Sequence, residues 1–359
     1  MDIYEIALNF DLDGEIIDVI ENNIGLINKT YIVTTTTNKY IIQKINSSVF
    51  KQPIDVMTNI KLVIEHLKNK VNNCEMLKLI STKTGNYYLI KNEEVYRCYN
   101  YLSDSIFYDK VINTKQLYEM GKTIGLFHRQ LLDFDSTKIK ETIKNFHDTD
   151  SRFDNLVSAY QNSTNYKQQE VMEIYSYIIE EKKNVINLNE LLKNNLIPKR
   201  VVHNDTKINN LVFSKTTNKG KCLIDLDTVM PGTILFDYGD ALRSIGSNTS
   251  EECFKFEDID FSLNNFIYFS IGYLSSIGDK LDISELEHLY DSILMITYEC
   301  GMRFLTDYLD GDKYFSVKFA KHNYLRAKNQ ILLAKKIKNK ELLINKILNA
   351  LKKRVIMIK

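Results

Sequence analysis

The stretch from residue 203 to residue 225 constrains the fold more than any other part of this 359-residue chain. It begins with a polar loop that ends at Asn210, and two short apolar runs follow at 211–213 and 222–224. Asparagine and glycine, which favour turns, lie between the two runs, so the pattern predicts a β-hairpin. Because a hairpin folds back on itself, Asn210 and Asp225 are expected on either side of one pocket.

The polar side chains of this stretch indicate phosphoryl transfer. The spacing His-x-Asp-x-x-x-x-Asn places a carboxylate, Asp205, where it can accept the proton of an attacking hydroxyl, while Asn210 offers an amide oxygen to a metal ion. Asp225 adds a second hard oxygen ligand, and such ligands suit Mg²⁺ bound to the phosphates of ATP. We therefore predict Asp205 as the catalytic base, and Asn210 and Asp225 as the metal ligands.

Two other interpretations compete with this one. An Asp and an Asn in a loop often form only turn hydrogen bonds with nearby backbone, but the ordered set with a second Asp at hairpin distance favours a functional site. A zinc site is disfavoured because no second His or Cys lies at ligand spacing around His203. His203 is instead expected to brace the loop.

The composition describes an ordinary globular chain without a charge bias. Lys and Arg number 47 and Asp and Glu 46, so the total charge favours neither a nucleic acid nor an anionic membrane as a partner. The acidic N-terminus does not resemble a secretion signal, and Ser and Gly interrupt the most apolar stretch, 266–277. Five cysteines without a Cys-x-x-Cys pair are expected to be reduced core thiols. These features predict a cytoplasmic protein.

Strand signals dominate the first hundred residues and predict a small nucleotide-binding lobe over residues 1–102. A helical face with apolar residues at 56, 60, 63, 64 and 67 interrupts them. The expected strands are 30–34, 40–45, 76–80, 87–90 and 95–102. The sequence therefore predicts a five-stranded antiparallel sheet with one helix.

Lys44 is the small-lobe candidate for pairing with nucleotide phosphates, because it ends the second of these strands. Gln43 is the inward residue instead if the pleat is offset by one residue. The helical carboxylate that would hold the lysine is either Asp55 or Glu65, and the sequence does not decide between them.

From residue 103 to residue 359 the chain is mainly helical apart from the hairpin, with apolar stripes at helical spacing that predict core-facing helices. A basic amphipathic helix from about residue 335 is expected to dock on this large lobe with its lysines solvated. A short hinge near 99–102 joins the lobes. The predicted fold class is α+β, with a small lobe of antiparallel sheet plus helix and a mainly helical large lobe.

The assembled motif resembles that of the aminoglycoside phosphotransferase and choline kinase superfamily, whose members have a two-lobed protein-kinase-like fold without a Gly-x-Gly loop. More narrowly, the chain is similar to N-acetylhexosamine 1-kinases and their close relatives. The segments that carry the resemblance are 25–31, 43–50, 141–149, 224–232, 236–244 and 303–315. The phosphotransfer motif is shared by the whole superfamily, and the last segment carries the narrower suggestion.

The resemblance implies ATP-dependent phosphorylation of the anomeric hydroxyl of N-acetylglucosamine or N-acetylgalactosamine. It also implies that Arg303 and Tyr314 line the sugar pocket, where Arg offers a fork of donors and Tyr an apolar face with one hydroxyl. Judged from the residues alone, surface ion pairs are the favoured explanation of Arg303, and core packing is the favoured explanation of Tyr314. Asp237 and Arg243 are expected to be structural, with Asp237 capping backbone amides from a glycine-containing loop.

Two residues depart from the pattern of the resemblance. Leu26 stands where a polar His is usual, which puts sugar contacts from the small lobe in doubt. Thr58 stands where a Glu is common on the first helix, which leaves the partner of Lys44 unassigned.

Two other functions stay open. The same chemistry with a cationic acceptor such as an aminoglycoside or choline is supported by an acidic group that could attract a polyamine. This group consists of Glu251, Glu252, Glu257, Asp258 and Asp260. A pseudokinase that only binds a nucleotide or partner is disfavoured, because Asp205, Asn210 and Asp225 are all present.

Overall fold

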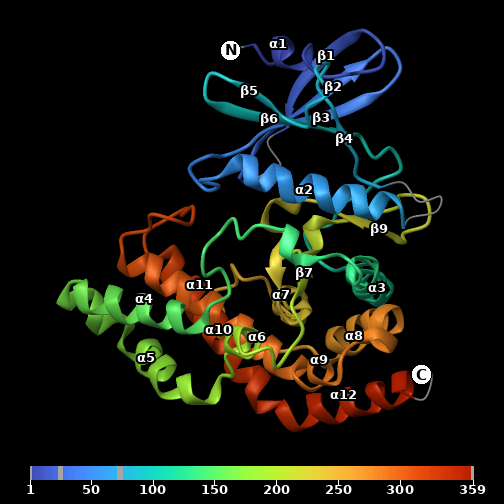
Figure 1. Ribbon diagram of the computed structural model, residues 1–359. Helices are drawn as coiled ribbons and strands as arrows, with labels where there is room; N and C mark the ends of the chain where they lie inside the picture. Colours follow the sequence, from blue (N-terminus) through green and yellow to red (C-terminus); the bar gives the residue numbers. More distant parts are fainter. Residues whose placement is uncertain (1, 23–26, 71–75, 357–359) are drawn as a thin grey trace.

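The computed structural model describes residues 2–22, 27–70 and 76–356. Figure 1 shows a strand-rich lobe above a helical one. The strands are β1 (Ile16–Asn22), β2 (Lys29–Thr35), β3 (Lys39–Lys44), β4 (Leu79–Ile80), β5 (Leu89–Lys91), β6 (Glu94–Asn100), β7 (Arg200–Val202), β8 (Leu211–Phe213), β9 (Gly220–Leu223) and β10 (Met230–Gly232). The α-helices are α1 (Ile3–Ala7), α2 (Pro53–Lys68), α3 (Thr114–Leu131), α4 (Thr149–Asn162), α5 (Asn165–Glu181), α6 (Leu188–Lys193), α7 (Ile234–Gly246), α8 (Leu263–Ile277), α9 (Ile283–Glu287), α10 (Leu289–Leu309), α11 (His322–Asn339) and α12 (Glu341–Ile356).

Strands β1 to β6 form one antiparallel sheet in the order β1-β2-β3-β6-β4, and β5 pairs with β6. The predicted α+β class, with an antiparallel sheet in the small lobe and a mainly helical large lobe, is confirmed. The prediction of five strands is wrong, because β1 also belongs to the sheet. This strand has a register shift between Ile16 and Asp18, and Ile17 and Ile20 are 64% and 56% exposed. It therefore lacks the alternation that marks a half-buried strand.

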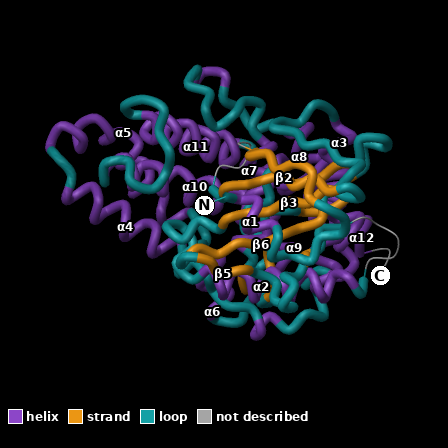
Figure 2. Tube along the Cα trace, turned by 90° about the horizontal axis from the view of Figure 1, so that it is seen from above, coloured by secondary structure: helices purple, strands orange, loops and turns teal. Residues whose placement is uncertain are grey.

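The two faces of the small-lobe sheet have different neighbours. Ile42 and Tyr96 point to the outer face, where they belong to a buried cluster with Phe10. Side chains alternate along a strand, so Gln43 and its cross-strand partner Arg97 point to the opposite face. Figure 2 shows the sheet lying over the helices below it. The β3 and β6 strands thus present Gln43 and Arg97 towards the large lobe.

Helix α2 lies between the sheet and the large lobe (Figure 1). Its apolar face from Val56 to Leu67 is buried, as the sequence predicted. Buried Asn59 donates from Nδ2 to the carbonyl oxygens of Lys140 (2.8 Å) and Val229 (3.0 Å). Its Oδ1 accepts the Lys140 N–H at 2.9 Å. One side chain therefore fixes α2 to two segments of the large lobe.

Helices α3 and α8 pack so closely that their backbones are in contact. A Cβ added to Gly121 would lie 2.1 Å from the carbonyl oxygen of Phe269, and one added to Gly272 would lie 2.0 Å from that of Tyr118. Only glycine fits at these two positions. The resulting helix pair supports one side of the loop at 203–210, called the catalytic loop after the base predicted in it, because His128 on α3 binds Asp237 on α7.

The remaining sequence predictions have mixed outcomes. The predicted docking of the C-terminal segment is confirmed, since Ile344 and Leu348 on α12 are fully buried. The segment is divided between α11 and α12, and its lysines are not all solvated, because Lys338 binds Glu181 and Lys340 binds Asp260. The prediction of core thiols holds for Cys98 and is wrong for Cys222, Cys253 and Cys300, which are half-buried. Cys74 lies outside the described residues. Among the described residues, no helix has both the length and the apolar character needed to cross a bilayer. The predicted lobe boundary at residue 102 falls between β6 and α3.

Candidate active site

The predicted hairpin is formed by β8 and β9. Leu211 pairs with Leu223, and the N–H of Ile224 donates to the carbonyl oxygen of Asn210 at 2.9 Å. This backbone bond joins the end of the catalytic loop to the residue before Asp225. The pairing therefore brings Asn210 and Asp225 together, as the sequence predicted.

Asp205 lies in a setting that keeps its carboxylate charged. Nδ2 of Asn210 donates to Oδ2 of Asp205 at 2.9 Å, and Nζ of Lys207 lies 2.9 Å from Oδ1. Burial raises the pKa of Asp205, but Lys207, His203 and the Asn210 amide outweigh it and lower the pKa below its usual value. At neutral pH the group is an ionised base held by two donors.

Asp225 lies in the opposite electrostatic setting. Burial, followed by the nearby carboxylates of Asp227 and Asp205, raises its pKa to about 7, against the opposing charges of Arg97 and Lys207. Its backbone has φ +60°, a left-handed conformation that turns the chain out of β9. Crowded carboxylates of this kind are stabilised by a cation between them.

A divalent cation fits the donors present. Asn210 donates from Nδ2 to Asp205, which leaves its Oδ1 as the oxygen that this side chain can offer to a cation. One amide oxygen and one carboxylate suit a hard ion that keeps water and phosphate oxygens as its other ligands. A cluster of three His, Cys, Asp or Glu side chains able to hold a metal does not occur in the described ranges.

Helix α7 fixes the backbone of the catalytic loop. Oδ2 and Oδ1 of Asp237 accept the N–H groups of His203 (2.7 Å) and Asn204 (2.6 Å). His128 also binds Oδ2 of Asp237 at 2.7 Å, and this contact lowers the pKa of Asp237 although burial alone raises it. Nε2 of His203 contacts the carbonyl oxygen of Ile224 at 2.8 Å. His203 braces the loop and Asp237 caps amides as predicted, but Asp237 lies on a helix and not in a loop.

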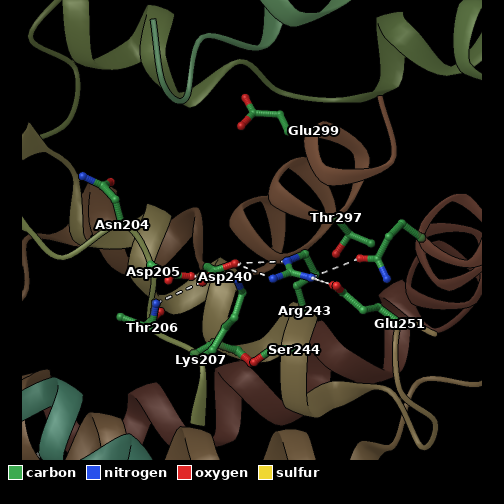
Figure 3. A network of polar contacts seen from close by, with 12 residues as sticks. Asn204, Asp205, Thr206, Lys207, Asp240, Arg243, Ser244, Glu251, Thr297 and Glu299 are labelled. Atoms are coloured by element: carbon green, nitrogen blue, oxygen red, sulfur yellow. Dashed lines mark hydrogen bonds and ion pairs between the residues drawn. The ribbon is translucent and has the colours of Figure 1, made fainter. Parts of the chain in front are cut away.

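A second network continues from the loop through Asp240 (Figure 3). The N–H of Thr206 donates to Oδ2 of Asp240 at 3.0 Å, and Arg243 donates to Oδ1 from Nε (3.0 Å) and Nη2 (2.9 Å). Nη1 of Arg243 lies 3.3 Å from Glu251. Burial raises the pKa of Glu251, but Arg243 and other cations outweigh it and lower the pKa to about 2. Arg243 is therefore structural, as predicted.

Lys44 lies apart from this group. Its ammonium binds Glu94 and its strand partner is Tyr96, both on the outer part of the sheet. Gln43 is the β3 side chain that faces the large lobe, and its Oε1 accepts from Nε (3.0 Å) and Nη2 (2.8 Å) of Arg97. The structure does not bring Lys44 to the catalytic residues, so its role with nucleotide phosphates stays a prediction.

The partner expected for Lys44 comes from neither helical carboxylate. Asp55 binds Lys140 at 2.5 Å, and Glu65 accepts from the Tyr87 hydroxyl at 3.1 Å. The Thr58 hydroxyl donates to the carbonyl oxygen of Ile54 within the same helix. Leu26, the other departure noted in the sequence, lies outside the described residues.

Arg303 lies among three aromatic rings on one side of the large lobe. Its guanidinium carbon is 5.3 Å from the ring centre of Phe146, 5.7 Å from that of Tyr314 and 5.3 Å from that of Phe315. Within the described residues it forms no ion pair, so surface pairing does not explain it. Tyr314 is 59% exposed, so core packing does not explain it either. The structure brings Arg303 and Tyr314 together.

The loop that carries Tyr314 is fixed by Asp307, near the end of α10. Asp307 accepts the backbone N–H groups of residues 313 to 315 at 2.8–2.9 Å. This holds the Tyr314 ring beside Arg303.

Sequence reasoning missed three residues of the site. Lys207 is part of the motif itself, two residues after Asp205, and its position could have been noticed. Arg97 and Asp227 form a buried ion pair between the lobes. Their pairing depends on the register of β3 with β6, for which the sequence contains no local signal.

Comparison with known proteins places the chain in a family. A family model described as the phosphotransferase enzyme family (APH) matches residues 18–256, more than half of the chain. The chain belongs to this phosphotransferase family. The match includes the small-lobe sheet, the catalytic loop and the hairpin, and it ends before Arg303 and Tyr314. The superfamily expected from the sequence is thus confirmed for the phosphotransfer machinery.

Solved structures share the whole architecture at low identity. An aminoglycoside phosphotransferase from Alicyclobacillus acidocaldarius is 12% identical, with a TM-score of 0.65 over 97% of this chain and 95% of its own. A choline kinase from Cryptosporidium parvum is 16% identical, with a TM-score of 0.58 over 96% of each chain. A spectinomycin phosphotransferase in complex with ADP and spectinomycin is 11% identical, with a TM-score of 0.58 over 94% and 97%. These similarities show the fold.

Proposed function

We propose that the protein is a sugar kinase that transfers the γ-phosphoryl group of ATP to the anomeric hydroxyl of an N-acetylhexosamine and releases the sugar 1-phosphate. The observation that carries the phosphotransfer is the meeting of Asp205, Asn210 and Asp225 at the base of one hairpin. The family match and the ADP complex of a structural neighbour support ATP as the donor. The group around Arg303 and Tyr314 supports a neutral, oxygen-rich acceptor.

In this proposal Asp205 accepts the proton of the attacking hydroxyl, and its low pKa keeps it ready as a base. Asn210 holds that carboxylate in place, and Asn210 and Asp225 provide the oxygen ligands of Mg²⁺. When bound with ATP, Mg²⁺ neutralises charge on the phosphate oxygens. The sequence assigns Lys44 to the nucleotide phosphates, and its ion pair with Glu94 on the outer face of the sheet does not support that assignment. Residues 1–102 and 103–359 form the two lobes in this proposal.

The acceptor side depends on Arg303 and Tyr314. Arg303 has five N–H donors and no ion pair within the described part of the chain, so they are available for ring or acyl oxygens. Tyr314 offers an exposed ring edge and a hydroxyl. A pocket built from a donor fork and aromatic faces is typical of sugar recognition.

The structure gives less support to a cationic acceptor. The acidic group that could attract a polyamine is largely neutralised inside the molecule: Arg243 and Arg326 bind Glu251, Lys318 binds Glu252, and Lys340 binds Asp260. Paired carboxylates provide little field for steering a cation. We therefore do not propose an aminoglycoside or choline as the acceptor.

A panel of acceptors with radiolabelled ATP tests the proposal. Label should move to N-acetylglucosamine or N-acetylgalactosamine, and the product should be the 1-phosphate by its sensitivity to mild acid and its NMR spectrum. The Asp205→Asn variant serves as the control for contaminating kinases. Transfer to kanamycin or choline in preference to either sugar would contradict the acceptor class, and nucleotide binding without transfer to any acceptor would contradict the activity.

A further inference from the structure

Two neighbouring arginines of the large lobe have no carboxylate at ion-pair distance in the described part of the chain. Arg152 lies in the first turn of α4, and Arg303 lies on α10, which packs against α4. Neither forms an ion pair within residues 2–22, 27–70 and 76–356. Arg243 and Arg326 differ from them, because each binds Glu251.

Phe146 contacts both of these arginines. Nη2 of Arg152 donates to the carbonyl oxygen of Phe146 at 2.8 Å, and the guanidinium of Arg303 lies over the Phe146 ring. Nε of Arg152 is buried and has no hydrogen-bond partner within the described structure. A buried donor without a partner costs free energy unless a bound group supplies the acceptor. The pair therefore has unused donors at a place that already contains the candidate sugar residues.

Glu299 is a neighbouring carboxylate whose oxygens contact side chains other than the two arginines. Glu299 lies one turn before Arg303 on α10, but its Oε1 accepts from the Thr149 hydroxyl at 2.6 Å and its Oε2 contacts Nδ1 of His147 at 2.9 Å. Figure 3 shows Glu299 set apart from the network of Asp240 and Glu251. The charge of Glu299 stabilises the charged form of Arg152. Asp148 is paired with Lys193, so two arginines face one carboxylate and the site keeps a net positive charge.

Arg152 stays charged over the range in which an enzyme assay is run. The ionisable groups around it are Arg303 and Glu299 on α10, Tyr314 in the following loop and Asp148 at the start of α4. Burial, followed by the like charge of Arg303, lowers the pKa of Arg152 to about 10. The guanidinium is thus protonated at pH 9 and below.

We propose that Arg152 and Arg303 act as a charge filter in the acceptor site, which admits an acylated amino sugar and rejects acceptors that carry an ammonium group. The inference rests on the proposed function and makes it narrower. An acylamino carbonyl oxygen has two lone pairs for the unused N–H donors. An ammonium group has donors only and the same charge as the pair, so it is repelled in a site of low dielectric constant.

The inference identifies Arg152 as a specificity-determining residue that the sequence did not reveal. A free hexosamine differs from its N-acetyl form by the loss of one acyl group and the gain of one charge. The filter therefore discriminates between two acceptors that share every hydroxyl group. An aminoglycoside carries several ammonium groups, and choline carries a quaternary one, so both are rejected for the same reason.

The ratio of kcat/KM for N-acetylglucosamine over glucosamine tests the filter in the full-length protein. The wild type should favour the acetylated sugar, and Arg152→Gln should lower the ratio by about tenfold or more, because it removes a charge but keeps a donor for Phe146. Arg152→Lys keeps the charge and should largely keep the ratio. Arg129→Gln is the matched control, since Arg129 is neutralised by Asp279 on the α3 side of the lobe.

The pH dependence of the same ratio provides a readout that a merely structural role would not change. Free amino sugars lose their ammonium proton near pH 8, by analogy with α-amino groups. The wild-type ratio should therefore fall between pH 6.5 and pH 9, whereas the ratio of Arg152→Gln should change little. Titrations within the enzyme affect both acceptors and cancel in the ratio.

Each outcome decides between the two proposals. An unchanged ratio in Arg152→Gln would overturn the filter and leave the sugar kinase proposal intact. Failure to phosphorylate either sugar would overturn the kinase proposal, and calorimetric binding of the two sugars to the wild type and to Arg152→Gln would then test the filter alone. Equal affinities for both sugars in the wild type, or no binding of either, would overturn it.

Discussion

In the proposed mechanism, Asp205 is the base, and its negative charge is what lets it accept the proton of the acceptor hydroxyl. We expect Asp205→Asn to lower kcat by about 10²- to 10⁴-fold, the usual contribution of a general base. The KM for ATP should change by less than about threefold, because the amide preserves shape while the nucleotide ligands stay in place. Steady-state kinetics measure both constants. The exposed Asp109→Asn is the control, and near-normal turnover of Asp205→Asn would remove Asp205 from its assigned role.

The raised pKa of Asp225 predicts that proton and cation compete at this residue. Because its pKa is about 7, Asp225 is protonated below this pH and ionised above it. The apparent affinity for Mg²⁺ should therefore fall about tenfold per pH unit below pH 7 and level off above it. Titration of Mg²⁺ at fixed ATP, monitored by activity from pH 5.5 to 8.5, measures this. In Asp225→Asn the slope should disappear together with most of the activity.

Lys44 is the residue for which sequence and structure differ most. Its ammonium binds Glu94 and its side chain is 30% exposed, which is a surface ion pair of small energetic value. We therefore expect Lys44→Ala to change the KM for ATP by no more than about twofold. A tenfold increase in the KM for ATP would instead show that Lys44 contributes to nucleotide binding. Gln43→Ala, on the inner face of the same strand, is the comparison variant.

At the scale of elements, the sequence predicted what depends on neighbouring residues. The hairpin from Leu211 to Leu223 was predictable, because its two apolar runs and its turn are local signals. Helix α2 was predictable from its apolar face. Strand β1 was not, since an exposed edge strand with a register shift has no periodic pattern. The face of β3 that points inward was not predictable either, because a shift of one residue exchanges Gln43 and Lys44.

Helix α2 offers a test of how an element is held in place. Asn59 forms three hydrogen bonds to the backbone of Lys140 and Val229, and Asn59→Ala leaves these buried or part-buried groups without that partner. We expect a loss of about 2–4 kcal/mol in the free energy of unfolding, since each unsatisfied group costs about 1–3 kcal/mol. Urea denaturation measures it. Thr58→Ala on the exposed side of the same helix should cost less than about 0.5 kcal/mol.

At the scale of the whole molecule, one carboxylate joins the two lobes. Asp227 follows the metal-ligand candidate Asp225 by two residues, and it accepts from Arg97 on β6 and, at 2.6 Å, from Nδ2 of Asn28 at the start of β2. The Arg97 and Asp227 side chains are 1% and 3% exposed. A buried charge pair therefore holds the small lobe beside the segment that follows Asp225, and Gln43 orients the Arg97 side chain. Residues 130 positions apart meet here, so no local pattern could have indicated the contact.

A double-mutant cycle on this pair tests whether it joins the lobes as a unit. Removing one partner leaves the other charge buried, so Arg97→Gln and Asp227→Asn should each lower the free energy of unfolding by about 3–5 kcal/mol. The double variant lacks both charges of this pair. It should lose clearly less than the sum of the two single-variant losses, with a coupling of about 2 kcal/mol. Urea denaturation of the four proteins measures the cycle. Additive losses would show that the two side chains act independently. The contacts of α2 through Asn59 would then be the ones that hold the lobes together.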